Sequence, residues 1–153
     1  MSNNCSSSIF TITNAEEAQN VYTSLNRGNI QFCIFNQTSD TSFTLQPPQQ
    51  KCDDGWDRLL QLLPNDECCY VLYNFDYISE SDGVKRSKLI MINWVPSKAK
   101  LRSKMLAAVY VKGMKTKFES WGGSIFTCVD AGGIESLDRN DIEKRITSRC
   151  TVK

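Results

Sequence analysis

Histidine is absent from the 153 residues of this sequence. Because histidine is the commonest general base and a common metal ligand, its absence excludes Ser-His and Cys-His nucleophilic sites and every metal site that needs an imidazole. The sequence also lacks the G-x-x-x-x-G-K-[ST] and G-x-G-x-x-G loops that hold phosphates. These absences argue against an enzyme, and we expect no cofactor and no metal.

Long apolar runs are missing as well. No stretch approaches the roughly 18 apolar residues of a membrane span, and the serine-rich start of the chain lacks the pattern of a secretory signal. We therefore expect a cytoplasmic protein. The length suits one domain, and 41% hydrophobic with 23% charged residues is typical of a folded chain. We expect a flexible segment over residues 1–8 and one domain over residues 9–150.

The seven cysteines do not form a recognisable framework for disulfides or zinc, because their number is odd and no C-x-x-C pair occurs. Cys33, Cys68, Cys69 and Cys128 fall in strand-like runs, where reduced thiols behave as small apolar side chains. A thiol enzyme would need Cys68 or Cys69 to be exposed with a lowered pKa, and their strand setting argues against that.

Acidic residues are absent from Val84 to Lys117, although this segment holds ten of the 18 basic residues. The rest of the chain carries eight basic and 17 acidic residues, so the net charge of +1 hides a strongly positive region. A helix that needed only solubility would mix both signs, since acids one turn away relieve repulsion. We infer that a partner supplies the missing negative charge.

Apolar periodicity predicts four helices, over Asn14–Gly28, Asp53–Pro64, Pro96–Phe118 and Leu137–Cys150. It predicts five strands, over Asn29–Gln37, Ser42–Gln46, Cys68–Ser79, Lys88–Pro96 and Ser124–Ala131. Asn14 is a candidate helix cap, Glu80–Ser87 an exposed hairpin loop, and the glycine pairs in WGG and AGGIES are turns. The fold class is α/β (α+β), with a mixed central sheet of about five strands sandwiched by helices.

The long basic helix separates into two faces when its residues advance by about 100° each. One arc is a core face, made of Leu106, Ala107, Tyr110, Val111, Met114 and Phe118. The opposite arc mixes apolar and basic residues, namely Leu101, Lys104, Met105, Ala108, Lys112 and Lys115. Lys117 falls near the core arc, which we attribute to a fraying last turn.

The mixed arc is typical of a protein-binding face, which combines apolar contact with charge that orients the partner. A second interpretation is a solvated face on which lysine stems cover some apolar residues. A third is a nucleic-acid site, but phosphate contact does not require Leu101 and Met105 at the centre of the patch, and no aromatic residue interleaves there to stack on bases.

Particular motifs resemble those of the actin-depolymerising factor/cofilin family, and within it the single-domain cofilins. They are ECCYVLYNFDY, the basic hairpin after it, and SKLIMINWVPSKAKLRSKMLAA, in which Trp94, Pro96 and Leu101–Met105 are the most specific positions. The resemblance is strong from about Leu63 to Met114. It implies the actin-depolymerising-factor homology fold, which is related to that of gelsolin. It also implies a protein that binds actin monomers and filaments, and that severs or depolymerises filaments without chemistry of its own.

The resemblance also assigns site residues by position. Contacts to both monomer and filament would come from the N-terminal segment and the long helix, namely Ser6, Ser7, Ser8, Leu101, Arg102, Lys104, Met105, Ala108, Lys112, Lys115 and Lys117. Filament-specific contacts would come from the hairpin and the last helix, namely Lys85, Arg86, Lys88, Lys144, Arg145 and Arg149. We expect a protein that is monomeric on its own and has no specific nucleic-acid partner.

Two further expectations concern regulation. Cofilins commonly carry a regulatory serine very near the N-terminus, and here Ser2, Ser6, Ser7 and Ser8 are candidates, because a phosphate would repel an acidic partner surface. Anionic phosphoinositides are expected to compete for the basic residues. Related family members that bind filaments, or the complex that branches them, without severing remain an alternative.

Overall fold

The computed structural model describes residues 10–47, 49–50, 54–79 and 81–151, so the expected flexible segment over residues 1–8 lies outside the described residues. Within the described part of the chain no helix is long and apolar enough to cross a membrane. The helices are α1 (Ala15–Asn26), α2 (Gly55–Leu62), α3 (Leu101–Ser120) and α4 (Arg139–Thr151), and a 3-10 turn, η2, spans Ile134–Ser136.

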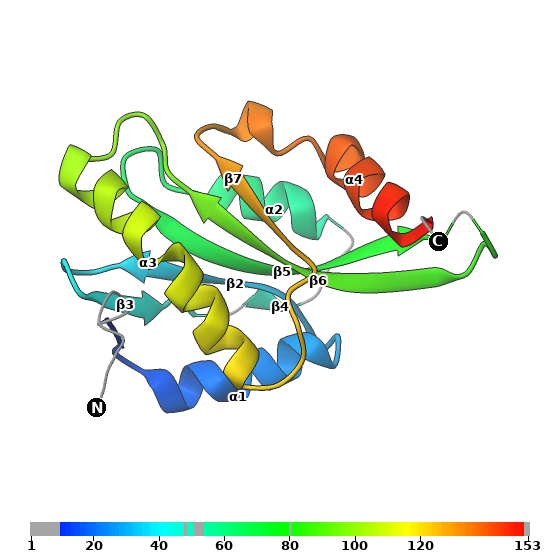
Figure 1. Ribbon diagram of the computed structural model, residues 1–153, viewed down its shortest axis with the longest axis horizontal. Helices are drawn as coiled ribbons and strands as arrows, with labels where there is room; N and C mark the ends of the chain where they lie inside the picture. The colour runs from blue at the N-terminus through cyan, green and yellow to red at the C-terminus, as the bar shows by residue number, and fades with distance from the viewer. Residues whose placement is uncertain (1–9, 48, 51–53, 80, 152–153) are drawn as a thin grey trace.

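One mixed sheet runs through the molecule (Figure 1). Its strands are β1 (Thr11–Ile12), β2 (Ile30–Gln37), β3 (Ser42–Leu45), β4 (Gln49–Gln50), β5 (Cys69–Ile78), β6 (Lys85–Trp94) and β7 (Thr127–Ala131). The order is β1-β3-β2-β5-β6-β7, and β4 pairs with β2. The pairs of β5 with β2 and β6 are antiparallel, whereas β7 is parallel to β6 and β1 to β3. The predicted mixed sheet sandwiched by helices is confirmed.

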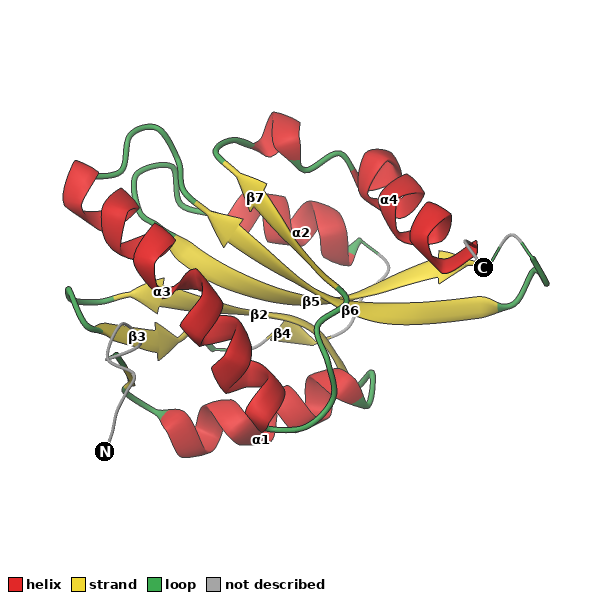
Figure 2. Cartoon of the chain, viewed as in Figure 1, coloured by secondary structure: helices red, strands yellow, loops and turns green. Residues whose placement is uncertain are grey.

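The sheet divides the core into two layers, with α1 and α3 on one face and α2 and α4 on the other (Figure 2). Strand β5 shows how the division arises, because successive side chains point to opposite faces. Tyr70 and Leu72 join the α1 and α3 layer, and Val71 and Tyr73 join the α2 and α4 layer. Both faces of the central strands are therefore covered, as their near-continuous apolar runs predict.

The long helix begins later and ends later than predicted. Pro96 opens a turn in which the Ala99 amide donates to the Pro96 carbonyl, and Lys100 is still extended, so α3 starts at Leu101. It ends at Ser120, because Gly122 and Gly123 take positive φ values that other residues rarely adopt. Lys117 lies in the last turn of α3, as predicted, and its side chain is exposed, so it does not join the core face.

The hairpin between β5 and β6 is more regular than predicted. Strand β6 starts at Lys85, which pairs with Ile78, so Lys85, Arg86 and Ser87 lie in a strand and not in a loop. We call residues 76–79 and 81–88 the hairpin arm. The last β5 residue that pairs with β2 is Tyr73, so the arm extends beyond the central part of the sheet, and α4 runs beside it (Figure 1).

Two smaller expectations also need correction. The described residues form seven strands and not five. Strands β1 and β4 were not predicted because they have only two residues each and show no periodicity. Asn14 does not cap α1 through its side chain, which instead pairs with the backbone of Leu45. The glycine pairs do fall between regular elements, and the second leads into η2.

Candidate functional site

Helix α3 has a buried back and an exposed apolar front. Tyr110, Met114 and Phe118 are buried against the sheet and α1, and Ala107 is buried in a smaller cluster with Cys68 and Ala99. The Tyr70 hydroxyl, also buried, donates to the Ala107 carbonyl at 2.7 Å and fixes the helix on the sheet. The predicted core arc is therefore confirmed, with Leu106 and Val111 partly buried at its margin.

The opposite face of α3 exposes large apolar side chains. Leu101 is 72% exposed and Met105 is 60% exposed, and Ala108 and Lys112 are also exposed. Val109, one turn after Met105, is 54% exposed and continues the apolar stripe. It belongs to neither arc of the sequence analysis, which missed it. We call Leu101, Arg102, Lys104, Met105, Ala108, Val109 and Lys112 the outer face of α3.

Two basic residues on the outer face, Arg102 and Lys104, already have partners within the chain. Arg102 Nε donates to Asp40 Oδ2 at 2.8 Å, and Nη2 lies 2.7 Å from the same oxygen. Lys104 Nζ donates to the Ser97 carbonyl at 2.7 Å. The hydrogen bond and charge of Arg102 hold the pKa of Asp40 below its usual value, and Asp40 in turn raises the pKa of Arg102. Both side chains of this pair remain accessible to a partner.

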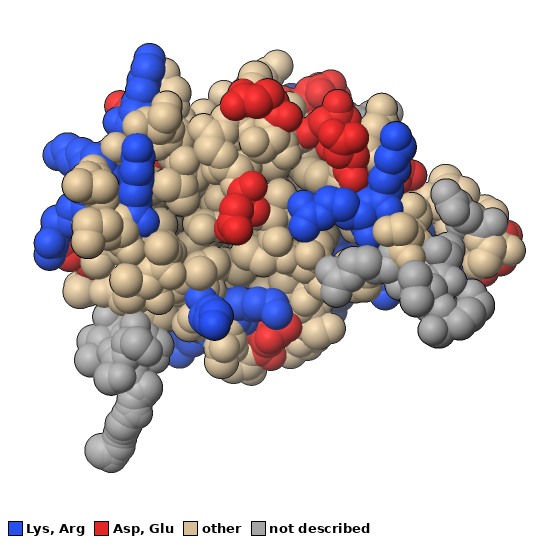
Figure 3. All heavy atoms as spheres, turned by 45° about the horizontal axis from the view of Figure 1, so that its top comes forward, with Lys and Arg blue, Asp and Glu red and all other residues tan. Residues whose placement is uncertain are grey.

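Figure 3 shows where the charges gather. Lysine and arginine side chains cluster on the left, over the start of α3, and a second basic group lies on the right, near α4, with acidic side chains between them. Further along α3, Lys117 is exposed, and Lys115 is half-buried. The predicted long-helix residues thus share one helix, but Lys115 and Lys117 lie two turns or more beyond Met105 and form a separate distal group.

The hairpin arm carries basic side chains that are neutralised locally. Lys85 Nζ lies 3.8 Å from Asp76 Oδ2, and Arg86 pairs with Asp82 across the turn. A hydrogen bond from the Val84 amide and the Arg86 guanidinium lower the pKa of Asp82. Lys88 stands over the ring of Phe126, with Nζ 5.1 Å from its centroid. The arm also exposes two large apolar side chains, Ile78 and Val84.

Helix α4 presents the remaining predicted residues that the structure describes. Lys144 and Arg145 are exposed, whereas the side chain of Arg149 lies outside the described residues, as do Ser6, Ser7 and Ser8. The helix is anchored by Ile142 and Ile146, which are buried in the α2 and α4 layer. Lys144 lines a hollow of about 460 Å³ together with Ile78 and Ser79 of the arm. The structure therefore places the basic residues of the arm and of α4 at one end of the molecule.

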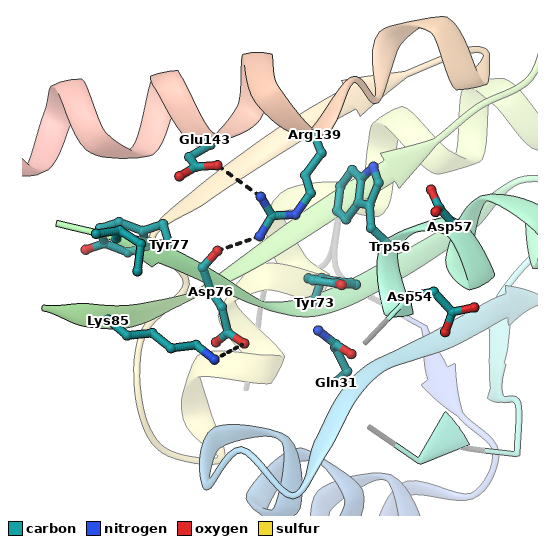
Figure 4. A pocket seen from close by; sticks show the side chains of 11 residues that line it. Gln31, Asp54, Trp56, Asp57, Tyr73, Asp76, Tyr77, Lys85, Arg139 and Glu143 are labelled. Carbon is teal, nitrogen blue, oxygen red and sulfur yellow. Dashed lines mark hydrogen bonds and ion pairs between the residues drawn. The ribbon is translucent and has the colours of Figure 1, made fainter. Parts of the chain in front are cut away.

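A larger cavity, of about 640 Å³, lies between α2, β5, β6 and α4 (Figure 4). Its walls combine aromatic side chains with charged ones, including Trp56, Tyr77, Lys85, Arg139 and Glu143. The dashed contacts in Figure 4 join Arg139 to Glu143 within α4, Arg139 to the Asp76 carbonyl of β5, and Lys85 of β6 to the Asp76 carboxylate. The cavity thus shows a polar junction between the arm and α4.

The thiols do not form a reactive site in the described part of the chain. Cys33, Cys68 and Cys69 are buried, and Cys128 is half-buried. Burial raises the pKa of all four, to about 12 for Cys33 and about 11 for Cys128. A reactive cysteine needs the opposite shift, so these four thiols lack the feature that a thiol enzyme would need. Their free, largely buried state agrees with the predicted role as small apolar side chains.

Comparison with solved structures identifies the fold. Cofilin from Streptomyces griseoflavus superposes with a TM-score of 0.72 at 23% identity, covering 92% of this chain and 98% of that one. Coactosin from Entamoeba histolytica gives 0.70 at 17% identity, covering 95% and 99%. At these identities the comparison shows the fold alone, which is that of the actin-depolymerising-factor homology domain.

Sequence comparison then gives the family. The family described as cofilin/tropomyosin-type actin-binding protein matches residues 11–147, so this chain belongs to the cofilin and actin-depolymerising factor family. Cofilin of Eremothecium gossypii is 36% identical over 97 residues, which cover 61% of this chain and 66% of that protein. Actin-depolymerizing factor 3 of Arabidopsis thaliana is 48% identical over 46 residues, which cover 30% and 32%. The matched region thus spans just under two thirds of the fungal relative.

Proposed function

We propose that this protein binds monomeric and filamentous actin through the outer face of α3 and promotes filament severing and depolymerisation. The observation that supports this most directly is the exposure of Leu101 and Met105 on a helix whose back is buried. Exposed apolar side chains of this size, flanked by cations, are suited to a hydrophobic groove with an acidic rim.

The binding energy in this proposal comes from the apolar anchors and the orientation from the charges. Burying a leucine or methionine side chain is worth roughly 1.5–3 kcal/mol, which makes Leu101 and Met105 the main contributors. Arg102 and Lys104 would meet acidic residues at the rim, Ala108 allows close approach, and Lys112 extends the contact. Because Arg102 is paired with Asp40 in the free protein, the actin carboxylate must displace an internal one.

The filament would be recognised by a second surface. Lys85, Arg86 and Lys88 of the hairpin arm, with Lys144 and Arg145 of α4, would touch a neighbouring actin subunit. Contact with two subunits favours a filament geometry that suits both surfaces, and the mismatch between decorated and bare filament would promote breakage. Arg149, Lys115 and Lys117 complete the proposed basic contacts.

Three further parts of the proposal rest on charge and family alone. Ser6, Ser7 and Ser8 would join the contact of α3, and a phosphate on one of them would oppose binding to an acidic surface. Phosphoinositides would compete for the same cations. The protein would act as a monomer in the cytoplasm, on the actin cytoskeleton.

A second candidate function is filament binding without severing. The solved structures do not separate this function from severing, because they show the fold alone. The two functions are distinguished by watching single filaments, since only a severing protein raises the number of filament ends.

Co-sedimentation with actin filaments tests the proposal. We expect Arg102→Ala/Lys104→Ala to lower the affinity for filaments, measured by pelleting, by about tenfold or more, because the variant lacks two charges that orient α3. The matched control is Arg27→Ala/Arg58→Ala, which removes two exposed arginines, one at the C-terminal cap of α1 and one on α2, and should pellet normally. A folded Arg102→Ala/Lys104→Ala variant that pellets like wild type would remove α3 from the binding site. Affinity for DNA or RNA that falls steeply with salt, without actin binding, would instead support a nucleic-acid module.

A further inference from the structure

One arginine that the sequence analysis did not single out joins α4 to the hairpin arm. Arg139 is the first residue of α4, and its side chain is 41% exposed. Its Nη2 donates to the Asp76 carbonyl at 2.7 Å and its Nη1 donates to Glu143 Oε1 at 2.9 Å. The guanidinium carbon lies 4.5 Å from the centroid of the Phe75 ring. One planar group therefore contacts two residues of β5 and one of its own helix.

The arm offers Arg139 a binding point because of where the sheet ends. Asp76 lies three residues beyond Tyr73, the last β5 residue that pairs with β2. Its backbone carbonyl accepts from Arg139, and its carboxylate lies 3.8 Å from Lys85 on β6. Figure 4 shows Arg139 and Lys85 approaching Asp76 from different elements. Asp76 thus connects α4 with β6, the strand that carries three of the proposed filament contacts.

Apolar packing and polar contacts both join α4 to the arm, and Tyr77 of the arm is buried in the same cluster as the inner side of the helix. Ile142 and Ile146 hold the inner side of the helix on the sheet. Between α4 and the arm, however, lie the cavities of about 640 Å³ and 460 Å³, and Glu143 lines both of them. A helix beside such hollows can tilt or slide unless polar contacts hold it, since close packing is what normally prevents such movement. Arg139 provides contacts of this kind at the start of α4.

We propose that Arg139 is a positioning residue, which holds α4 against the hairpin arm so that Lys144 and Arg145 form one filament-binding surface with Lys85 and Arg86. This inference rests on the proposed function, and it names a residue that acts through others and not by touching actin. The guanidinium is suited to the role because its rigid fork serves two acceptors while its face lies on an aromatic ring. A lysine keeps the charge but has neither the fork nor the flat face.

The test compares filament and monomer binding in Arg139→Lys and Arg139→Ala. We expect both variants to lose filament affinity by about 5- to 20-fold, as coupled residues in contact commonly do. We expect the affinity for monomeric actin, which depends on α3, to stay within about twofold of the wild-type value. The Arg139→Lys variant keeps the net charge, so a loss in this variant is due to geometry. Arg58→Ala, an exposed arginine on α2, is the matched control for arginine removal.

A double-mutant cycle separates positioning from direct contact. If Arg139 acts through α4, Arg139→Lys should have little further effect in a chain that already carries Lys144→Ala/Arg145→Ala. Fully additive losses would mean that Arg139 contacts actin itself and would overturn the inference, as would normal filament binding by Arg139→Lys. If wild type fails to pellet with filaments, the proposed function fails instead, so the two failures are distinguishable.

Discussion

The two basic surfaces differ in how many elements build them. The outer face of α3 comes from a single helix whose back is buried. A hydrogen bond from the Tyr70 hydroxyl to the Ala107 carbonyl fixes this helix on the sheet. The surface of the hairpin arm and α4 comes from two elements distant in sequence, joined beside two hollows by Arg139 and Asp76, which are 63 residues apart. The first surface is preformed, and the second is assembled.

This difference predicts where substitutions act. Substitution of an exposed side chain on α3 changes only the contact that this side chain makes, because the helix keeps its position without it. On the assembled surface, substitution of a residue such as Arg139 changes the contacts that other residues make. The hypothesis that α3 provides affinity and the assembled surface provides filament selectivity follows from this comparison, and the experiments below test its parts in order of expected effect.

Charge placed on the apolar stripe of α3 should have the largest effect. We expect Leu101→Asp/Met105→Asp to weaken monomer and filament binding by about 100-fold or more, because two anchors worth roughly 1.5–3 kcal/mol each are lost. Both side chains are exposed, so the variant should fold with a normal unfolding midpoint in urea. Isothermal titration with monomeric actin measures the loss. Leu62→Asp, an exposed leucine on α2, is the control, and equal losses in both variants would refute the special role of α3.

Removal of the internal competitor should have a smaller and opposite effect. In Asp40→Asn the side chain keeps its size but no longer neutralises Arg102, so Arg102 is available to an actin carboxylate. We expect monomer affinity to rise by roughly two- to fivefold, since an exposed ion pair is weak. Glu16→Gln, an exposed acid on α1, controls for the change of net charge. A loss of affinity in Asp40→Asn would show that Asp40 instead holds Arg102 in its binding orientation.

The preformed surface was largely predictable from sequence, whereas the assembled surface was not. Periodicity of 3.6 residues separates the two faces of α3, and strong apolar runs identify β5 and β6, because these signals are local. The contacts of Arg102 with Asp40 and of Arg139 with Asp76 span 62 and 63 residues, and no local pattern reveals such pairs.

Element ends were the other weak point of the sequence analysis. Lysine and serine are compatible with a helix, so nothing in the residues from Ser97 to Lys100 showed that α3 starts only at Leu101. Lys85 and Arg86 were assigned to a loop because a turn and charges surround them, but cross-strand pairing with β5 extends the strand to include them. In both cases tertiary context decided the boundary.

The smallest expected effect is that of pH between 6.5 and 8 on either surface. The chain has no histidine, and burial raises the pKa of Cys33 and Cys128 to about 12 and about 11, so these thiols stay protonated in this range. The pKa values of Asp40 and Asp82 are lowered. The stability that their ion pairs contribute is therefore present above the ordinary aspartate pKa, and it is lost only as the pH falls through the lowered pKa values.

We expect the free energy of unfolding in urea to change by less than about 0.5 kcal/mol between pH 6.5 and 8, and monomer affinity by less than about twofold. Arg102→His is the positive control: its affinity should fall as the pH rises through about 6.5, where an imidazole loses its charge. A several-fold pH response in wild type, as steep as in Arg102→His, would show that a group outside the two surfaces controls binding.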